Sequence, residues 1–153
     1  MGAIIDGKQL SLRLKGEMAE EVKVLEAKYG RVPSLAVILV GENPASQSYV
    51  RGKIKAAEEV GIRSVLITMA ADTTEEALLA EIDRLNADAL IDGVLVQLPL
   101  PKHIDSDKVI AAIRAEKDVD GFHPMNVANL WLKQPCTLPC TPKGIIKLLK
   151  RAD

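Results

Sequence analysis

The stretch SLAVILVG, residues 34–41, is an almost unbroken apolar run. A strand of a parallel sheet is covered by helices on both faces, so its sequence is continuously apolar rather than alternating. The turn-like residues GENPAS, 41–46, come next, and an amphipathic pattern then extends over 46–60. We therefore expect a buried strand at 34–41 that leads through a turn into a helix.

The same alternation continues along the chain. Two further apolar segments, RSVLITM at 63–69 and DGVLVQL at 92–98, predict strands. Helical patterns lie at 11–30, 46–60, 73–88, 105–113, 127–133 and 143–153. Strands that alternate with helices of this length form βαβ units with right-handed crossovers. The predicted fold class is therefore α/β, a three-layer α/β/α sandwich with a mainly parallel sheet.

Short polar side chains indicate where three of the helices begin. Ser46 is the expected N-cap of the helix at 46–60. Thr73 and Glu76 have the spacing of a capping box. Thr141 and Pro142 suit the cap and the first position of the last helix.

The totals exclude several classes of protein. The chain has 153 residues, a formal net charge of −1 and 3% aromatic residues, which argues against binding to nucleic acid or to an anionic membrane. Its apolar runs are too short to span a bilayer, and its two cysteines do not make a disulfide framework. It contains no G-x-G-x-x-G or G-x-x-x-x-G-K-[ST] phosphate-binding pattern. We expect a cytoplasmic protein.

Lys53 does not fit the pattern of its own helix. At about 100° per residue, Val50, Ile54 and Val60 lie on one side, and Lys53 falls within that apolar side. One interpretation is that its stem packs on the apolar side while its ammonium group reaches water. The other is a desolvated amine that favours its neutral form and acts as an acid or base near neutrality.

Three more polar residues lie on the side where ligands bind an open parallel sheet, beyond the carboxyl ends of the strands. Tyr49 is either a core ring or a stacking surface for a flat ligand. Gln97, at the end of an apolar strand, either bonds to a neighbouring loop or orients a polar ligand. Asp120, in DVDG, either holds a turn or offers its carboxylate to the paired N–H donors of a ligand.

The histidines and cysteines do not predict a metal site. These residues are His103, His123, Cys136 and Cys140, and their spacing fits no common zinc pattern. Nothing in the sequence places a cysteine beside a histidine for nucleophilic catalysis. We expect no metal cofactor.

Four segments are distinctive when they are taken together. They are VGENPASQSYVRGKIKAAEEVGI at 40–62, IDGVLVQLPLP at 91–101, KDVDGFHPMN at 117–126 and PCTPKGI at 139–145. In this order and with these separations, the chain resembles the family of bifunctional methylenetetrahydrofolate dehydrogenase/methenyltetrahydrofolate cyclohydrolases. The likeness spans almost the whole chain, from IIDGK at 4–8 to the last helix.

The resemblance implies a binding site for tetrahydrofolate derivatives. It makes Lys53 the central catalytic residue, tuned by Gln97, and Asp120 the group that holds the pterin ring by its N–H edge. It also makes Tyr49 the residue that stacks on the aminobenzoyl ring. The substrate-binding residues implied in this way are Tyr49, Lys53, Val96, Gln97, Leu98 and Asp120.

The activity implied by the resemblance has two steps. NADP, or NAD in some members, oxidises 5,10-methylenetetrahydrofolate to the 5,10-methenyl form, which is then hydrolysed to 10-formyltetrahydrofolate. The dinucleotide-binding domain of the family is absent from this sequence, and the last helix has no stop signal before residue 153. We therefore expect residues 1–140 to form the folate-binding catalytic domain and residues 141–153 to begin the helix that connects it to the missing domain.

A chain of this kind is expected to be a fragment of a homodimeric parent enzyme, with little activity of its own. One alternative is a folate-binding module without turnover. Another is a flavodoxin-like nucleotide-binding protein that only looks similar.

Overall fold

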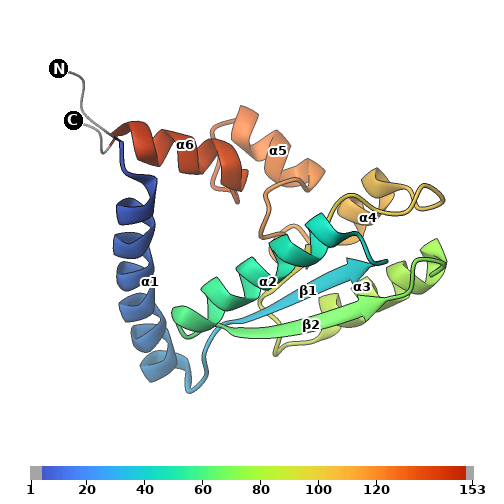
Figure 1. Ribbon diagram of the computed structural model, residues 1–153, viewed down its shortest axis with the longest axis horizontal. Helices are drawn as coiled ribbons and strands as arrows, with labels where there is room; N and C mark the ends of the chain where they lie inside the picture. Colours follow the sequence, from blue (N-terminus) through green and yellow to red (C-terminus); the bar gives the residue numbers. More distant parts are fainter. Residues whose placement is uncertain (1–4, 151–153) are drawn as a thin grey trace.

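The computed structural model describes residues 5–150, which fold into helices and strands that alternate through the first two thirds of the chain (Figure 1). In chain order these elements are α1 (Gly7–Tyr29), β1 (Ser34–Val40), α2 (Pro44–Glu59), β2 (Arg63–Met69), α3 (Glu75–Ala87), β3 (Gly93–Val96), α4 (Ser106–Ala112), α5 (Pro124–Trp131) and α6 (Cys140–Lys150).

The apolar stretch at 34–41 forms the central strand of the sheet. The strand order is β2-β1-β3, and both neighbours run parallel to β1. Leu35 of β1 is aligned with Ser64 on one side and with Gly93 on the other. A central position requires cover on both faces, which is why this segment is apolar at almost every residue.

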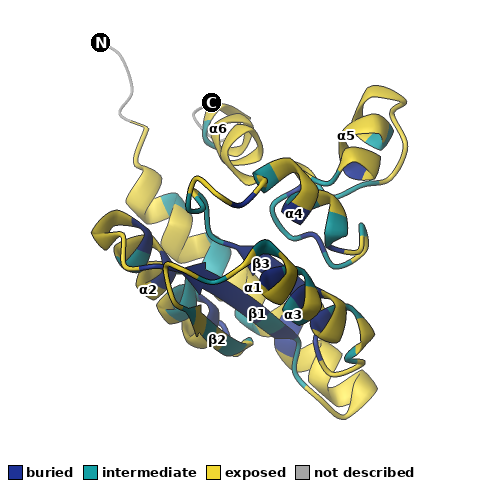
Figure 2. Ribbon diagram, turned by 90° about the vertical axis from the view of Figure 1, so that its right-hand side faces the viewer, coloured by how far each residue is buried: buried dark blue, intermediate teal, exposed yellow. Residues whose placement is uncertain are grey.

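Alternate residues of β1 point to opposite faces of the sheet. Ala36, Ile38 and Val40 pack in the larger core cluster, which includes residues of α3 and α4. Val37 and Leu39 pack in the second cluster, which includes residues of α2. Figure 2 shows buried residues concentrated in the strands and on the helix sides that face them. The predicted three-layer α/β/α sandwich is thereby confirmed.

Helices α1 and α6 lie apart from this core. Figure 1 shows α1 at one end of the sheet, and α6 crosses near the amino end of α1. Val22 is buried in α1, whereas none of the residues of α6 is buried. Lys15 of α1 forms an ion pair with Glu59 of α2 at 2.5 Å. Residues 151–153, predicted to end the last helix, lie outside the described residues. Among residues 5–150, none of the helices combines the length and the hydropathy that a membrane span requires.

Two of the predicted caps are wrong because the helices begin earlier than expected. Asn43 is the N-cap of α2, and its Oδ1 accepts the N–H of Ser46 at 3.1 Å. Pro44 takes the first helical position, where a missing N–H costs nothing. Helix α6 begins at Cys140, so Thr141 lies inside it rather than at its cap.

The predicted capping box of α3 is also wrong, by one residue. Thr74 is the N-cap, and its hydroxyl oxygen accepts the N–H of Ala77 at 3.2 Å. A capping box needs Glu or Gln at the third helical position, which is Ala77 here. Thr73 therefore precedes the cap, and Glu76 does not reach back to it.

Candidate active site

The segment 117–121 runs beside β3 and continues past it. The N–H of Val94 donates to the carbonyl oxygen of Lys117 at 2.7 Å, and Val94 pairs with Asp118 in an isolated parallel bridge. Because this bridge extends the sheet, the residues that follow it emerge at the carboxyl ends of the strands. That edge is where open parallel sheets bind their ligands.

Several of the predicted site residues meet at this edge. Val96 and Leu98 line a small cavity together with Asp118, Asp120 and Phe122. The two apolar residues thus lie beside the carboxylate with which the resemblance associates them. Their contact with a folate stays a prediction.

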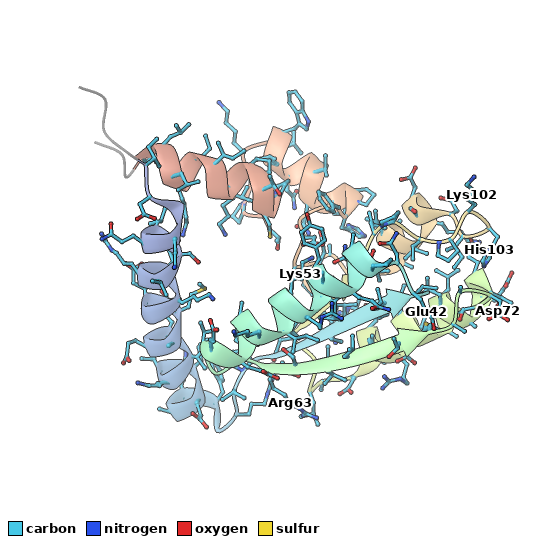
Figure 3. The ribbon with its side chains drawn as sticks, viewed as in Figure 1. Glu42, Lys53, Arg63, Asp72, Lys102 and His103 are labelled. Carbon is cyan, nitrogen blue, oxygen red and sulfur yellow. The ribbon has the colours of Figure 1, made fainter. Side chains whose placement is uncertain are left out.

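Lys53, which lies in helix α2, interacts electrostatically with Asp120. Figure 3 labels Lys53 midway along this helix, and its side chain is half-buried. Val50 and Ile54 of the same helix pack in the second core cluster, so the apolar side predicted for this helix is confirmed. The positive charge of Lys53 lowers the pKa of the Asp120 carboxyl group, which identifies the two as electrostatic neighbours.

Asp120 is a carboxyl group with an unusual environment. Burial raises its pKa above the ordinary value of an aspartate, Lys53 opposes this rise, and the charge of Asp118 adds to it. Within residues 5–150 its carboxylate accepts no hydrogen bond; only its backbone N–H is bonded, to Asp118. Both oxygens of Asp120 are therefore available to the donors of a ligand.

Asp118, and not Asp120, holds the turn. It is 4% exposed, and its Oδ1 accepts the backbone N–H groups of Asp120 at 3.2 Å and Gly121 at 3.0 Å. Its Oδ2 accepts the N–H of His123 and the Nδ2 of Asn126, both at 2.9 Å. The turn interpretation that the sequence left open for Asp120 thus applies to the aspartate two residues earlier.

Gln97 is half-buried directly after β3. Its Nε2 donates to the carbonyl oxygen of Leu98 at 2.6 Å, whereas its Oε1 is buried and has no partner within the described part of the chain. The Leu98–Pro99 peptide bond is cis. A buried acceptor without a partner costs about 1–3 kcal/mol, and a ligand donor would remove that cost. The interpretation that Gln97 bonds to a neighbouring loop therefore accounts for its Nε2 group but not for its Oε1.

Tyr49 is one helical turn before Lys53 and is 67% exposed. Its exposure excludes the interpretation as a core ring. The ring is accessible to a flat ligand, as the stacking interpretation requires, and its role in binding stays a prediction.

Cys140 is part of this site, although the sequence did not indicate it. Although Cys140 is exposed as a whole, its Sγ–H donates to the carbonyl oxygen of Val119 at 3.5 Å, and partial burial of the thiol raises its pKa, with the charge of Asp120 adding to the rise. The backbone of 137–139 packs so closely on Gly121 that a Cβ there would lie 2.7 Å from it. Two segments distant in sequence meet here, and no residue spacing signals such a contact.

The two histidines make local hydrogen bonds. His103 bonds through Nε2 to the carbonyl oxygen of Thr73 at 2.8 Å. Nδ1 of His123 accepts the N–H of Met125 at 3.1 Å, which caps α5 and starts it before the predicted residue 127. The described residues contain no group of three or more His, Cys, Asp or Glu side chains that could hold a metal ion.

Comparison with known sequences supports the resemblance. The chain is 55% identical over 153 residues to the Bifunctional protein FolD of Exiguobacterium sibiricum, and 54% identical over 150 residues to that of Listeria innocua. These matches cover 100% and 98% of this chain but only 55% and 52% of the two relatives. The chain therefore spans about half the length of the relatives that it matches.

Solved structures give the same result. The Bifunctional Enzyme FolD of Campylobacter jejuni has 50% sequence identity and a TM-score of 0.95, over 98% of this chain and 53% of that one. The FolD of Trypanosoma brucei, crystallised with NADP and an inhibitor, has 39% identity and a TM-score of 0.92, over 97% of this chain and 51% of that one. Residues 5–120 match the family model described as tetrahydrofolate dehydrogenase/cyclohydrolase, catalytic domain. The chain thus belongs to the tetrahydrofolate dehydrogenase/cyclohydrolase family.

Proposed function

We propose that this chain binds tetrahydrofolate derivatives at the Lys53–Asp120 site. We also propose that it is the catalytic part of a longer enzyme, an NADP-dependent methylenetetrahydrofolate dehydrogenase and methenyltetrahydrofolate cyclohydrolase. The observation that carries the proposal is the half-buried carboxylate of Asp120, which accepts no hydrogen bond within residues 5–150 and lies near enough to Lys53 for that charge to lower its pKa, at the ligand-binding edge of the sheet. Family membership supplies the substrate class.

Each site residue then has a distinct role. The carboxylate of Asp120, which accepts no hydrogen bond within residues 5–150, takes the paired N–H groups of the pterin ring. Gln97 offers its unpartnered Oε1 to the amine of Lys53 or to the substrate. Tyr49 stacks on the aminobenzoyl ring, while Val96 and the neighbouring Leu98 give the ring an apolar surface.

Hydrolysis of the methenyl form is the step for which this chain carries the groups. A water molecule attacks the cationic carbon between N5 and N10, and Lys53, once its ammonium group has given up a proton, accepts the proton that the water loses. The bond between this carbon and N5 then breaks, N5 takes up a proton and the new hydroxyl group loses one, which leaves the formyl group on N10. An ammonium group at the same place would repel the cation and would have no lone pair to accept a proton.

NADP does not fit this chain. The sequence contains neither of the glycine-rich phosphate-binding patterns, G-x-G-x-x-G and G-x-x-x-x-G-K-[ST]. We therefore assign dinucleotide binding to the part of the longer protein that this chain lacks. In this proposal residues 1–140 are the folate-binding catalytic domain, and residues 141–153 begin the connection between the two parts.

We further propose that the longer protein is a cytoplasmic homodimer. Its two cysteines in this chain, Cys136 and Cys140, are free thiols, as is usual in a reducing compartment. The dimer follows from the resemblance alone, and we expect this chain by itself to be a monomer.

Turnover tests the role of Lys53. The absorbance of methenyltetrahydrofolate is followed with the wild-type chain, with Lys53→Met and with Lys55→Met, a control on the exposed side of the same helix. We expect wild type and Lys55→Met to exceed the buffer rate and Lys53→Met to fall to it. Equal rates for all three proteins above buffer would exclude Lys53 as the base. Binding of a folate analogue without turnover by the wild type would favour the binding module.

Ligand binding tests the role of Asp120. We expect Asp120→Asn to weaken binding of a folate analogue while the melting temperature changes little, and the exposed Asp83→Asn on α3 to change neither. If the main effect of Asp120→Asn is on the melting temperature, this residue holds the turn after all. A parallel titration with FMN covers the flavodoxin-like alternative, because FMN binding without folate binding would reject our proposal.

A further inference from the structure

Two buried polar side chains lie beneath the turn that carries Asp120. Asp118 is 4% exposed and Asn126, in α5, is 5% exposed. They bond directly, because Nδ2 of Asn126 donates to Oδ2 of Asp118 at 2.9 Å. Buried polar groups are costly unless their partners satisfy them, so the remaining partners of this pair reveal what it holds together.

Asp118 holds the backbone of the turn itself. Its two oxygens accept three backbone N–H groups, from Asp120, Gly121 and His123, in addition to the amide of Asn126. A carboxylate is suited to this task because it is an acceptor at both oxygens and carries no hydrogen of its own. The turn is thus folded around Asp118, which leaves the side chain of Asp120 free to approach Lys53.

Asn126 connects the turn to the segment that leads into α6. Its Nδ2 also donates to the carbonyl oxygen of Ala115 at 2.9 Å, and its Oδ1 accepts the N–H of Thr137 at 3.3 Å. Thr137 begins the stretch that packs on Gly121 and brings Cys140 to the site. One amide therefore links the segment after α4, the turn and the segment before α6.

We propose that Asp118 and Asn126 are positioning residues for the folate site. They hold the 118–121 turn and the 137–140 segment against each other, so that Asp120 keeps its half-buried place beside Lys53. The identity of the ligand in this inference rests on the function proposed above. The clamp itself, meaning the hydrogen-bonded pair Asp118–Asn126 with its backbone partners, can be tested without any ligand.

The titration of Asp120 reports on the clamp. Burial is the main cause of its raised pKa, so a turn that loosens and admits water lets this pKa fall toward that of an ordinary aspartate. The charged groups that act on Asp120 are Lys53 from α2 and Asp118 from its own turn, and Asp120 in turn raises the pKa of the nearby Cys140 thiol in α6. None of these is removed when Asn126 is changed, so the comparison isolates the position of the turn.

The test compares Asn126→Leu with Asn129→Leu in the whole chain. Both asparagines lie in α5, but the side chain of Asn129 makes no hydrogen bond within residues 5–150. The carboxyl carbon of Asp120 is titrated by NMR without ligand, and the affinity for a folate analogue and the melting temperature are measured on the same samples. If Asn126→Leu does not fold, Asn126→Ser replaces it, because a short hydroxyl side chain loses the reach to both partners without placing an apolar group among them.

We expect Asn126→Leu, or Asn126→Ser, to lower the titration midpoint of Asp120 and to weaken binding of the analogue by about 10- to 100-fold. Asn129→Leu should leave both at their wild-type values. A lower melting temperature with an unchanged midpoint and unchanged affinity would overturn the inference and leave the pair a purely structural role. Should the wild type bind no folate analogue, the proposed function fails, and the ligand-free titration of Asp120 still decides whether the clamp exists.

Discussion

Substitution of Gly121 by alanine tests the contact that completes the site. Gly121 has a φ of +74°, in the left-handed region that favours glycine. A Cβ at this position would lie 2.7 Å from backbone atoms of Leu138 and Pro139. Both partners are backbone, so neither can move away by a rotamer change, and the segment before Cys140 must shift as a whole.

The expected loss of stability has two parts. The left-handed backbone costs an alanine about 1–2 kcal/mol relative to glycine. The overlap with the 137–139 backbone adds about 1–3 kcal/mol, the usual cost of overpacking a close-packed contact. Gly121→Ala should therefore lower the free energy of unfolding by about 2–5 kcal/mol, a large share of the stability of a domain of this size.

Substitutions at two other glycines distinguish the backbone contribution from the overlap contribution. Gly30 has a φ of +71° but no atom within 4 Å of an added Cβ. Gly30→Ala should therefore lower the free energy of unfolding only by the backbone contribution of about 1–2 kcal/mol. Gly16 lies inside α1 with the same open space, so Gly16→Ala should gain about 0.5–1 kcal/mol from better helix propensity.

Urea unfolding followed by circular dichroism gives the free energy of unfolding of all four proteins from their midpoints and slopes. Equal losses for Gly121→Ala and Gly30→Ala would refute the close packing of the 137–139 segment on the turn. The clamp of Asp118 and Asn126 would then have much less to hold.

Two further predictions concern helix capping and pH. Thr74→Ala should lower the free energy of unfolding by about 1 kcal/mol because it removes the acceptor of the Ala77 N–H. Thr73→Ala should have a much smaller effect. Equal losses of stability in thermal unfolding would contradict the assignment of Thr74 as the N-cap and favour the capping box of Thr73 and Glu76. Arg31 lowers the pKa of Asp92 through two hydrogen bonds at 2.6 and 2.7 Å. A lowered pKa in the folded state stabilises the protein above the ordinary aspartate pKa of about 4, and this contribution is lost as the pH falls through the lowered value. The wild type should therefore lose more stability between about pH 5 and pH 2 than Asp92→Asn, by no more than about 1 kcal/mol because the pair is partly exposed; parallel pH profiles in urea unfolding would contradict this.

The layers of the fold could be predicted because burial leaves its mark on each element separately. The apolar run at 34–41 indicated a strand covered on both faces, and β1 is the central strand. The period of helix α2 placed Lys53 on the apolar side, where its side chain is half-buried. The start of each helix could not be predicted as well, because neighbouring residues such as Thr73 and Thr74 have the same capping chemistry. Which of the two threonines becomes the N-cap depends on the direction from which the chain enters the helix.

Sequence alone determined the α/β class, the apolar side of the helix at 46–60 and the short list of polar residues near the carboxyl ends of the strands, since each of these depends on local pattern. The tertiary structure decided which role each of these residues has. It turned Asp118 inward to bind the backbone of the turn, left Asp120 beside Lys53, and brought Cys140 over Gly121. Two aspartates in DVDG have identical side chains and nearly identical neighbours in sequence. Only the arrangement of N–H donors in space makes one of them a structural acceptor and leaves the other available to a ligand.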